Sequence, residues 1–435
     1  MENLLEHYNS KGYLNGSILI ASNDKTLINQ GFGYANLEHK ILNKPTTKFR
    51  IGSLSKAFTA YAIFQLHAKK YININHKISH YLVDYPNGEL ITIYHCLTNS
   101  TGISNYTSQP NFWITDMRLS LSLSELINKF KDLPLKFKPG TKFEYSNSNY
   151  AILTFIIEKV SGMSYEDYMM KNVFLPLGLY NTGCDNGSRV IKDSASGYSI
   201  WEDIIQAEYT DMSFPLGAYG LYSTTEDLYI WDKALRNIDF LSEELKYKMF
   251  KPNHGNYSCG WMNSNILNRS CLHHFGDISG FTSSFHRFIN EQITVIFLSN
   301  LNITPVSNIT KELLKHICEE DPEPIVSWRE IMINNRLDFE GHYKMTSNNF
   351  KMNMEISKKN NSLFLTVPKL YGALYKYRLI PIEEDLKSIT FKTEFVNETL
   401  TVYFNGTTID LIKYTDCYSI TYSGLKIDQI NVKNN

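Results

Sequence analysis

Alternating and blockwise patterns of apolar residues predict strands first and then a long helix. Residues 16–22 (GSILIAS) and 26–35 (TLINQGFGYA) read as two strands around the polar turn 23–25, which predicts a hairpin. Beyond Gly52, the apolar positions of 53–70 (SLSKAFTAYAIFQLHAKK) recur at helical spacing and end in two lysines. This segment is predicted to be a buried helix.

The stretch from about 80 to 250 is mostly helical in pattern, with long polar loops. Residues 148–162 illustrate it, because Ser148 is a candidate N-cap, the middle is apolar and Gly162 is a candidate stop. We expect a helical subdomain here.

Short runs rich in β-branched and aromatic residues return after about residue 255. They are 271–276 (CLHHFG), 281–288 (FTSSFHRF) and 293–300 (ITVIFLSN), followed by a helix over 307–318. Strands at both ends with helices between them predict an α/β (α+β) fold, in which one antiparallel sheet is built from both termini and flanked by helices.

The last hundred residues look different again, since nearly every segment is strand-like. About eight short strands are enough to close a small antiparallel barrel or sandwich. The charged, proline-bearing EEDPEP begins a linker. The predicted organisation is therefore a first domain over 1–320, a linker over 321–334 and an all-β domain over 335–435.

Composition and charge narrow the functional classes. Hydrophobic residues make up 43% and charged residues 20% of the 435 residues, as in globular proteins. The net charge of −1 gives no electrostatic reason to expect nucleic acid. No apolar run is long enough to cross a bilayer, and the start lacks a signal-peptide pattern, so we expect a cytoplasmic protein. The six scattered cysteines are expected to be reduced and buried.

Ser53 and Lys56 are the most informative pair for chemistry. Three residues apart on a helix they share a face, so a lysine with a lowered pKa could take the serine's proton. The Ser-x-x-Lys pattern also occurs at Ser22 and Ser423, but only Ser53 has the helical context. The alternative is that Ser53 caps the helix and Lys56 is solvated.

Two further short segments add candidate residues. Tyr145 and Asn147 precede a buried helix, where a phenol can pass protons and an amide can hold a carbonyl or the lysine. His274 and Gly276 lie on a predicted strand followed by Asp277, where an exposed backbone N–H can stabilise an oxyanion. Each has a structural alternative. The neighbouring histidines raise the idea of zinc, but no cysteine or carboxylate joins them in register, so we expect no metal.

Together these elements resemble the serine β-lactamase and penicillin-binding protein superfamily, in their order along the chain. The branch most similar is the class C β-lactamase-related group, with D-aminopeptidases, certain esterases and a soluble penicillin-binding endopeptidase. The resemblance covers roughly residues 14 to 320, and the C-terminal domain resembles lipocalin-like barrels loosely. The segments that carry it are FRIGSLSKAFTA, LTNSTGI, PGTKFEYSN, VFLPLGLYNT, GLYSTTEDL, YSCGW and HFGDISGF.

The resemblance implies acyl transfer without a cofactor. Ser53 would form an acyl-enzyme, Lys56 and Tyr145 would share the acid and base work, and Asn147 would orient substrate. His274 and Gly276 would help bind substrate, and the backbone N–H groups of Ser53 and Asp277 would form the oxyanion hole.

One departure bears on the substrate. His274 stands where penicillin-binding enzymes usually carry a lysine, and a neutral imidazole holds a carboxylate weakly. The leading expectation is a peptidase acting on D-amino-acid peptides, with β-lactams as possible acylating ligands. A carboxylesterase remains an alternative, as does a catalytically silent homologue that binds cell-wall peptide or self-assembles. The oligomeric state is open.

Overall fold

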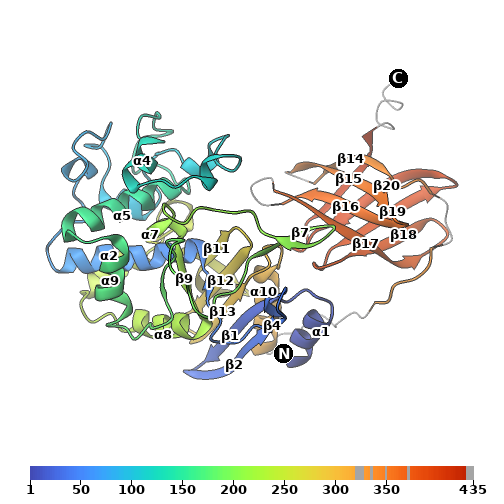
Figure 1. Cartoon of the computed structure of the whole chain (residues 1–435), viewed down its shortest axis with the longest axis horizontal. Helices are drawn as coiled ribbons and strands as arrows, with labels where there is room; N and C mark the ends of the chain where they lie inside the picture. Colours follow the sequence, from blue (N-terminus) through green and yellow to red (C-terminus); the bar gives the residue numbers. More distant parts are fainter. Residues whose placement is uncertain (319–327, 334–336, 348–349, 370–372, 428–435) are drawn as a thin grey trace. The chain divides into compact units, whose positions relative to one another are not determined.

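Strands from residues 16–32 and 262–299 form one six-stranded antiparallel sheet (Figure 1). Its order is β10-β11-β12-β13-β1-β2. Strand β1 therefore pairs with β13, which lies more than 250 residues later in the sequence. This confirms the predicted sheet built from both termini. The strands are β1 (Gly16–Ser22), β2 (Lys25–Phe32), β10 (Met262–Ile266), β11 (Arg269–Ile278), β12 (Phe281–Phe288) and β13 (Ile293–Ser299).

The computed structural model describes residues 1–318, 328–333, 337–347, 350–369 and 373–427. The chain forms two compact units. The sheet unit comprises 16–197 and 207–302, and the barrel unit comprises 1–15, 198–206 and 303–435. Most of the predicted linker lies outside the described residues.

The central strands of the sheet are buried on both faces. Every residue of β12 and β13 is buried, whereas none of β10, at the edge, is. A strand covered on both faces needs apolar or hydrogen-bonded residues at every position. The continuous run ITVIFLS of β13 meets that need.

The helix predicted over 53–70 is α2 (Ser55–Ala68), and it is buried along its length. A helix that is apolar on all sides belongs in a core rather than at a surface. It is preceded by a 3₁₀ turn, η1 (Gly52–Leu54), so Ser53 lies in this turn and not in the α-helix.

The remaining elements of the sheet unit are mainly helical, as predicted for 80–250. The helices are η2 (Ile78–His80), α3 (Ile93–Leu97), η3 (Tyr106–Ser108), η4 (Asp116–Arg118), α4 (Leu123–Asn128), α5 (Asn147–Ser161), α6 (Tyr165–Met169), η5 (Met170–Phe174), α7 (Leu216–Tyr219), α8 (Thr225–Arg236), α9 (Glu243–Phe250) and η6 (His254–Asn256). The short strands are β3 (Tyr34–Asn36), β4 (Ile41–Leu42), β5 (Phe49–Arg50), β6 (Gly183–Cys184) and β9 (Leu221–Ser223).

The ends of α5 test two predicted caps. Gly162 follows the helix with φ +67°, the left-handed conformation that glycine adopts without strain. The prediction for Ser148 is wrong, because the cap position is Ser146. The Ser148 hydroxyl instead donates a hydrogen bond to the carbonyl of Ser104.

 The oxygen–oxygen distance in that hydrogen bond is 2.7 Å, so the side chain is used to join two segments rather than to cap the helix.

Eight antiparallel strands of the barrel unit close on themselves. Their order is β16-β15-β14-β21-β20-β19-β18-β17, and β16 also pairs with β17. Alternate residues are buried, as in β18 and β19, which fits a barrel filled by its own side chains. The strands are β14 (Gly341–Thr346), β15 (Lys351–Lys359), β16 (Ser362–Pro368), β17 (Leu374–Glu384), β18 (Ser388–Thr393), β19 (Thr399–Asn405), β20 (Thr408–Thr415) and β21 (Thr421–Lys426).

A hairpin from the middle of the chain extends the barrel sheet. β7 (Tyr198–Trp201) and β8 (Asp203–Gln206) pair with each other, and β7 lies parallel to β17. The prediction of mainly helical structure across 80–250 is wrong for this segment. Its strand character depends on a partner far away in sequence. The unit also includes helices α1 (Glu2–Ser10) and α10 (Val306–Ile317).

A buried carboxylate joins several strands of the barrel. Glu398 is 1% exposed and accepts hydrogen bonds from the hydroxyls of Tyr377 and Tyr414, each at 2.5 Å. It also pairs with Lys369. Because these partners stabilise the ionised form, the pKa of Glu398 lies below its ordinary value despite burial.

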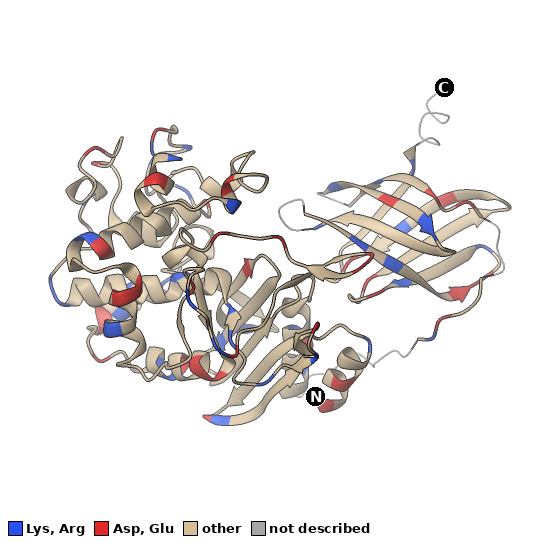
Figure 2. Cartoon of the chain, viewed as in Figure 1, with Lys and Arg blue, Asp and Glu red and all other residues tan. Residues whose placement is uncertain are grey.

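Charged side chains are interspersed over both units (Figure 2). In the part of the chain that the structure describes, no helix has both the length and the apolar character to span a bilayer. Five of the six cysteines are buried.

Candidate active site

Ser53 and Lys56 meet at the junction of η1 and α2. Ser53 is the one residue of 51–60 that is not buried. Its Oγ lies 3.0 Å from Nζ of Lys56, whose side chain is fully buried. The turn therefore presents a hydroxyl to solvent and keeps an amine directly behind it.

Lys56 Nζ has two other hydrogen-bond partners. It donates to Oδ1 of Asn147 and to the carbonyl of Ala218, both at 2.7 Å. No carboxylate pairs with it among the described residues. Burial without a counter-charge penalises the ammonium form, so the pKa of Lys56 is well below its ordinary value.

These contacts suit a neutral amine. Its two N–H groups match the two oxygens at 2.7 Å, and its lone pair is left for the Ser53 hydroxyl proton. The geometry provides a base at the serine.

A loop over 99–107 positions the segment that carries Tyr145 and Asn147. The backbone N–H of Asn147 donates to Oδ1 of Asn105, and its Nδ2 donates to Oγ1 of Thr107, both at 3.0 Å. Asn99 Oδ1 accepts from the N–H of Ser146 at 3.2 Å. The amide of Asn147 is thereby held toward Lys56.

Tyr145 belongs to a group of rings beside the amine. Its ring centroid lies 4.8 Å from Lys56 Nζ. It is also 6.1 Å from the ring of Tyr257 and 5.9 Å from that of His274. The Tyr145 ring thus lies against the amine of Lys56.

His274 is a neutral member of this group. Its Nδ1 lies 2.6 Å from the carbonyl of Phe275, so Nδ1 carries the proton, and Nε2 accepts from the Tyr257 hydroxyl at 3.3 Å. Burial and the nearby Lys56 lower the pKa of His274 to about 3. The residue therefore supplies no cation at neutral pH.

Strand β11 runs against the serine turn along one edge. β10 pairs with β11 only up to His273, so among the described strands none covers this edge from His274 onward. A Cβ added to Gly276 would lie 2.0 Å from the carbonyl oxygen of Ile51, and one added to Gly52 would lie 2.6 Å from the backbone N of Asp277. Two glycines therefore permit the close approach.

Ser283 on β12 fastens the same contact. Its hydroxyl lies 2.9 Å from the carbonyl oxygen of Ile51 and 3.3 Å from that of Gly276. The backbone N of Asp277 is consequently placed next to the Ser53 turn, where an oxyanion would need it. The Asp277 carboxyl itself is partly buried, and burial raises its pKa to about 6.

The seven residues proposed from sequence are thus assembled around one point. Ser53, Lys56 and Asn147 are in direct contact, Tyr145 and His274 lie beside them, and the backbone of 276–277 flanks the turn. Sequence reasoning missed the other groups that hold them. Those groups are Gly52, Asn105, Thr107, the Ala218 carbonyl, Tyr257 and Ser283.

Only some of these supporting residues could have been found from the sequence. Tyr257 opens the YSCGW segment, and Ala218 comes just before GLYSTTEDL, two segments that carry the family resemblance. Nothing in the local pattern distinguishes Asn105 or Thr107 from other loop residues.

The neighbouring histidines do not converge. His273 and His286 stack at 5.2 Å between centroids as cross-strand partners on β11 and β12. Successive side chains of a strand point to opposite faces, so His274 points away from this pair. Across the residues that the structure describes, no group of three potential ligands could hold a metal ion.

Known proteins share the sequence pattern of this chain. The family described as Beta-lactamase matches residues 1–317. Protein flp of Staphylococcus aureus (strain MRSA252) is 30% identical over 336 residues, which cover 73% of this chain and 65% of that protein. The chain thus spans less than two thirds of the length of this relative.

Solved structures share the fold. The octameric penicillin-binding protein homologue from Pyrococcus abyssi has a TM-score of 0.64 at 24% identity and covers 98% of both chains. The D-amino acid amidase from Ochrobactrum anthropi SV3, complexed with D-phenylalanine, has a TM-score of 0.66 at 21% identity, over 73% of this chain and 97% of that chain. The first of these likenesses extends over both units.

Proposed function

The chain belongs to the beta-lactamase family, and from that premise we propose that it is a serine hydrolase that forms an acyl-enzyme on Ser53. The superfamily resemblance drawn from its motifs is confirmed by the family match. We propose amides and short peptides of D-amino acids as its substrates.

One observation carries the proposal. The buried Lys56 Nζ lies 3.0 Å from Ser53 Oγ and has no carboxylate partner among the described residues, so burial lowers its pKa and favours the neutral amine that can accept the hydroxyl proton. A serine hydroxyl needs such a base, because it is a weak nucleophile by itself.

The remaining residues supply the later steps of the proposed reaction. Ser53 Oγ attacks the substrate carbonyl while its proton passes to Lys56 Nζ. The backbone N–H groups of Ser53 and Asp277 stabilise the oxyanion, a contribution of about 10²–10³ in rate per donor. The proton reaches the leaving nitrogen through Lys56 or Tyr145, and water then attacks the acyl-enzyme and restores Ser53.

The neutral state of His274 supports an uncharged leaving group. Its Nδ1 proton is used by the Phe275 carbonyl, and its Nε2 is an acceptor. An acceptor in this position gives no attraction for a substrate carboxylate. Amides and esters therefore fit better than β-lactams. The fold shared with a D-amino acid amidase supports amides of D-amino acids.

Paired substrates test the proposal. We expect the wild-type protein to hydrolyse D-alaninamide faster than D-alanyl-D-alanine, whose leaving group carries a carboxylate. Ser53→Ala should remove this hydrolysis, whereas Ser188→Ala, at an exposed serine, should leave it unchanged.

Other outcomes identify the alternatives. Hydrolysis of p-nitrophenyl acetate without any D-alaninamide turnover would replace the proposal by a carboxylesterase. Binding of these compounds without turnover of any of them would indicate a catalytically silent homologue.

A further inference from the structure

Tyr257 lies within the group of rings beside Lys56, although it is not among the residues proposed from sequence. Its ring centroid is 5.4 Å from that of Phe143, 6.1 Å from that of Tyr145 and 5.9 Å from that of His274. The side chain is fully buried. Tyr257 therefore packs against both the segment that leads into α5 and strand β11.

The loop that carries Tyr257 is fixed against neighbouring parts of the site. Gly260 has φ +80°, and a Cβ added to it would lie 2.8 Å from the backbone N of Ala57 in α2. A Cβ added to Gly255 would lie 2.4 Å from the ring of Phe143. Two glycines thus let the loop approach α2 and the segment before α5 closely, and this packing leaves the Tyr257 ring little freedom.

The Tyr257 hydroxyl is a hydrogen-bond donor to His274. It lies 3.3 Å from Nε2. Nδ1 lies 2.6 Å from the Phe275 carbonyl oxygen and carries the proton, because a carbonyl only accepts. Burial raises the pKa of the Tyr257 phenol well above its ordinary value, so the hydroxyl keeps its own proton. Both ring nitrogens of His274 are therefore engaged by the protein.

The other titratable groups that act on His274 do not favour its protonation. Lys56 and His273 are both bases, and each lowers the pKa of His274. Tyr145, a phenol, packs against the ring at 5.9 Å between centroids. Bases can add only positive charge, which opposes a proton on the imidazole. The Tyr257 hydroxyl acts in the same direction, because it uses the lone pair that a proton would need.

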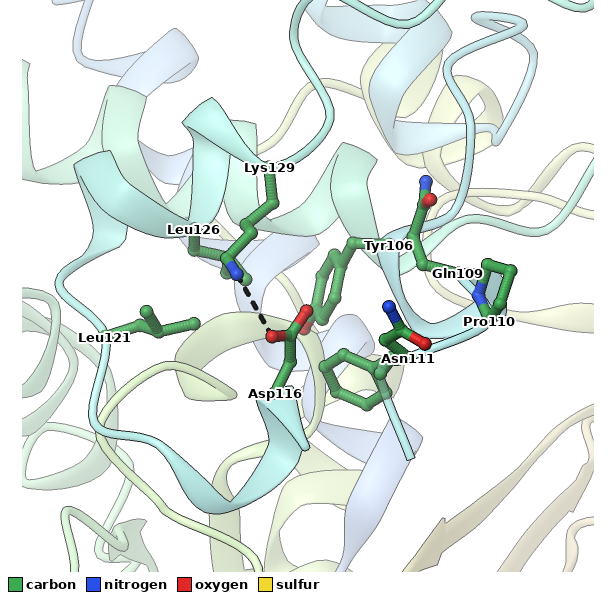
Figure 3. Close-up of a pocket in the computed structure, with 9 residues that line it drawn as sticks. Tyr106, Gln109, Pro110, Asn111, Asp116, Leu121, Leu126 and Lys129 are labelled. Atoms are coloured by element: carbon green, nitrogen blue, oxygen red, sulfur yellow. Dashed lines mark hydrogen bonds and ion pairs between the residues drawn. The ribbon is translucent and has the colours of Figure 1, made fainter. Parts of the chain in front are cut away.

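Two other buried phenols near the site do not share this contact. Tyr150 donates to the carbonyl of Leu97 at 2.9 Å, and the hydroxyl of Tyr106 has no hydrogen-bond partner among the described residues. Tyr106 instead lines a cavity of about 150 Å³ beside α4, and none of the residues lining that cavity belongs to the proposed active site (Figure 3). The contact with His274 thus distinguishes Tyr257.

We propose that Tyr257 is a positioning residue that determines which substrate charge the site accepts. By donating to Nε2 it fixes the His274 ring and occupies the nitrogen that would otherwise bind a proton and attract a substrate carboxylate. The proposal rests on the proposed function, because it concerns the leaving group of the same acyl transfer. It makes Tyr257 one cause of the preference for amides over substrates with a charged leaving group.

A variant without the hydroxyl tests the proposal. Tyr257→Phe keeps the ring and so separates the hydrogen bond from the packing. Tyr229→Phe in α8 is a matched control, because it removes a buried phenol hydroxyl that has no hydrogen-bond partner among the described residues. The measurement is kcat/KM on D-alanyl-D-alanine and on D-alaninamide, at pH 6 and at pH 8.

We expect Tyr257→Phe to raise the ratio of kcat/KM for D-alanyl-D-alanine to that for D-alaninamide by about three- to tenfold at pH 6, the factor that one hydrogen bond usually contributes. The gain should be smaller at pH 8, because the freed imidazole must bind a proton to attract the carboxylate. Tyr229→Phe should leave the ratio unchanged. An unchanged ratio in Tyr257→Phe, including an equal loss on both substrates, would overturn the proposal.

A spectrum recorded without turnover separates this proposal from the catalytic one. In Ser53→Ala protein labelled with ¹⁵N-histidine, long-range ¹H–¹⁵N correlations report which nitrogen carries the proton, and His274→Gln identifies the signal. We expect His274 to be protonated on Nδ1, and Tyr257→Phe to shift its Nε2 resonance. Protonation on Nε2, or an unchanged Nε2 resonance in Tyr257→Phe, would refute the role of Tyr257.

The two proposals can therefore fail separately. The expected spectra without any hydrolysis by the wild type would keep the contact between Tyr257 and His274 and refute the hydrolase. Hydrolysis of D-alaninamide by a protein whose His274 is protonated on Nε2 would do the reverse. The Ser53→Ala spectrum carries the test if Tyr257→Phe does not fold.

Discussion

At the scale of single residues, the chemistry depends on the protonation of one buried amine. Lys56 lies in the core of the sheet unit with only neutral oxygens around Nζ. Water solvates an ammonium far better than these groups can, so burial favours the neutral form. A hydrolase built this way remains active until the amine is protonated.

The pH dependence of catalysis follows with a definite sign. As the pH falls, Lys56 gains a proton and can no longer accept one from Ser53. We therefore expect kcat/KM to fall on the acid side of a single ionisation whose pKa is well below the ordinary lysine value. Lys56→Ala should lower kcat/KM by about 10²–10⁴-fold.

Two control variants test whether Lys56 acts as a proton acceptor or only as a positive charge. Lys56→Arg introduces a guanidinium that does not deprotonate, so it should be nearly as inactive as Lys56→Ala. Lys69→Ala changes an exposed lysine at the far end of α2 and should have no effect. An arginine variant with wild-type activity would contradict the role of Lys56 as base.

At the scale of elements, the site depends on how closely η1 lies against β11. The Ser283 hydroxyl holds the Ile51 and Gly276 carbonyls together, and glycine at 52 and 276 leaves room for backbone on both sides. The contact aligns the Ser53 hydroxyl with the strand that carries the Asp277 N–H.

Gly276→Ala tests this alignment. The new methyl would lie 2.0 Å from the Ile51 carbonyl oxygen, so strand and turn must separate. We expect kcat/KM to fall by about 10²-fold or more, the loss typical of one oxyanion donor, with a folded protein by circular dichroism.

A second glycine variant distinguishes an effect on the contact between η1 and β11 from a general loss of stability. Gly162 has φ +67° and open space around it, so Gly162→Ala strains the end of α5 far from β11. It should lower the melting temperature and leave kcat/KM unchanged. Full activity in Gly276→Ala would mean that the close packing of η1 on β11 does not matter for catalysis.

The elements show where sequence patterns suffice. The apolar run of α2 and the β-branched runs of β12 and β13 predict their structure, because burial selects such residues along the whole element. The pattern places Ser53 in the α-helix, whereas it lies in the 3₁₀ turn just before it. The two kinds of turn differ in their backbone hydrogen bonds and not in the residue types they contain, so the pattern cannot tell them apart.

Long-range pairing is where the patterns fail. The strands β7 and β8 are only four residues long each, and the local sequence gives no sign that β7 pairs with β17. The same holds within the site, where Asn105 and Thr107 act only through Asn147 on a distant segment. Residue types at Ser53, Lys56, Tyr145 and Asn147 could be proposed from sequence, but their mutual distances could not.

At the scale of the whole molecule, the chain combines two units with different sources of order. The sheet unit depends on a core around α2, while the barrel closes through the pairing of β16 with β17 and contains the buried Glu398 network. Alternating patterns predict the eight strands, but the carboxylate that joins them was not foreseen. A lone Glu in a polar turn carries no local sign of burial.

The central claim is that Ser53 of the intact chain is a reactive nucleophile activated by Lys56. Intact-mass spectrometry after incubation with a fluorophosphonate tests it most directly. We predict one adduct per wild-type chain, mapped by peptide analysis to Ser53 and absent from Ser53→Ala. No adduct on the wild type, or the same adduct on Ser53→Ala, would contradict the account.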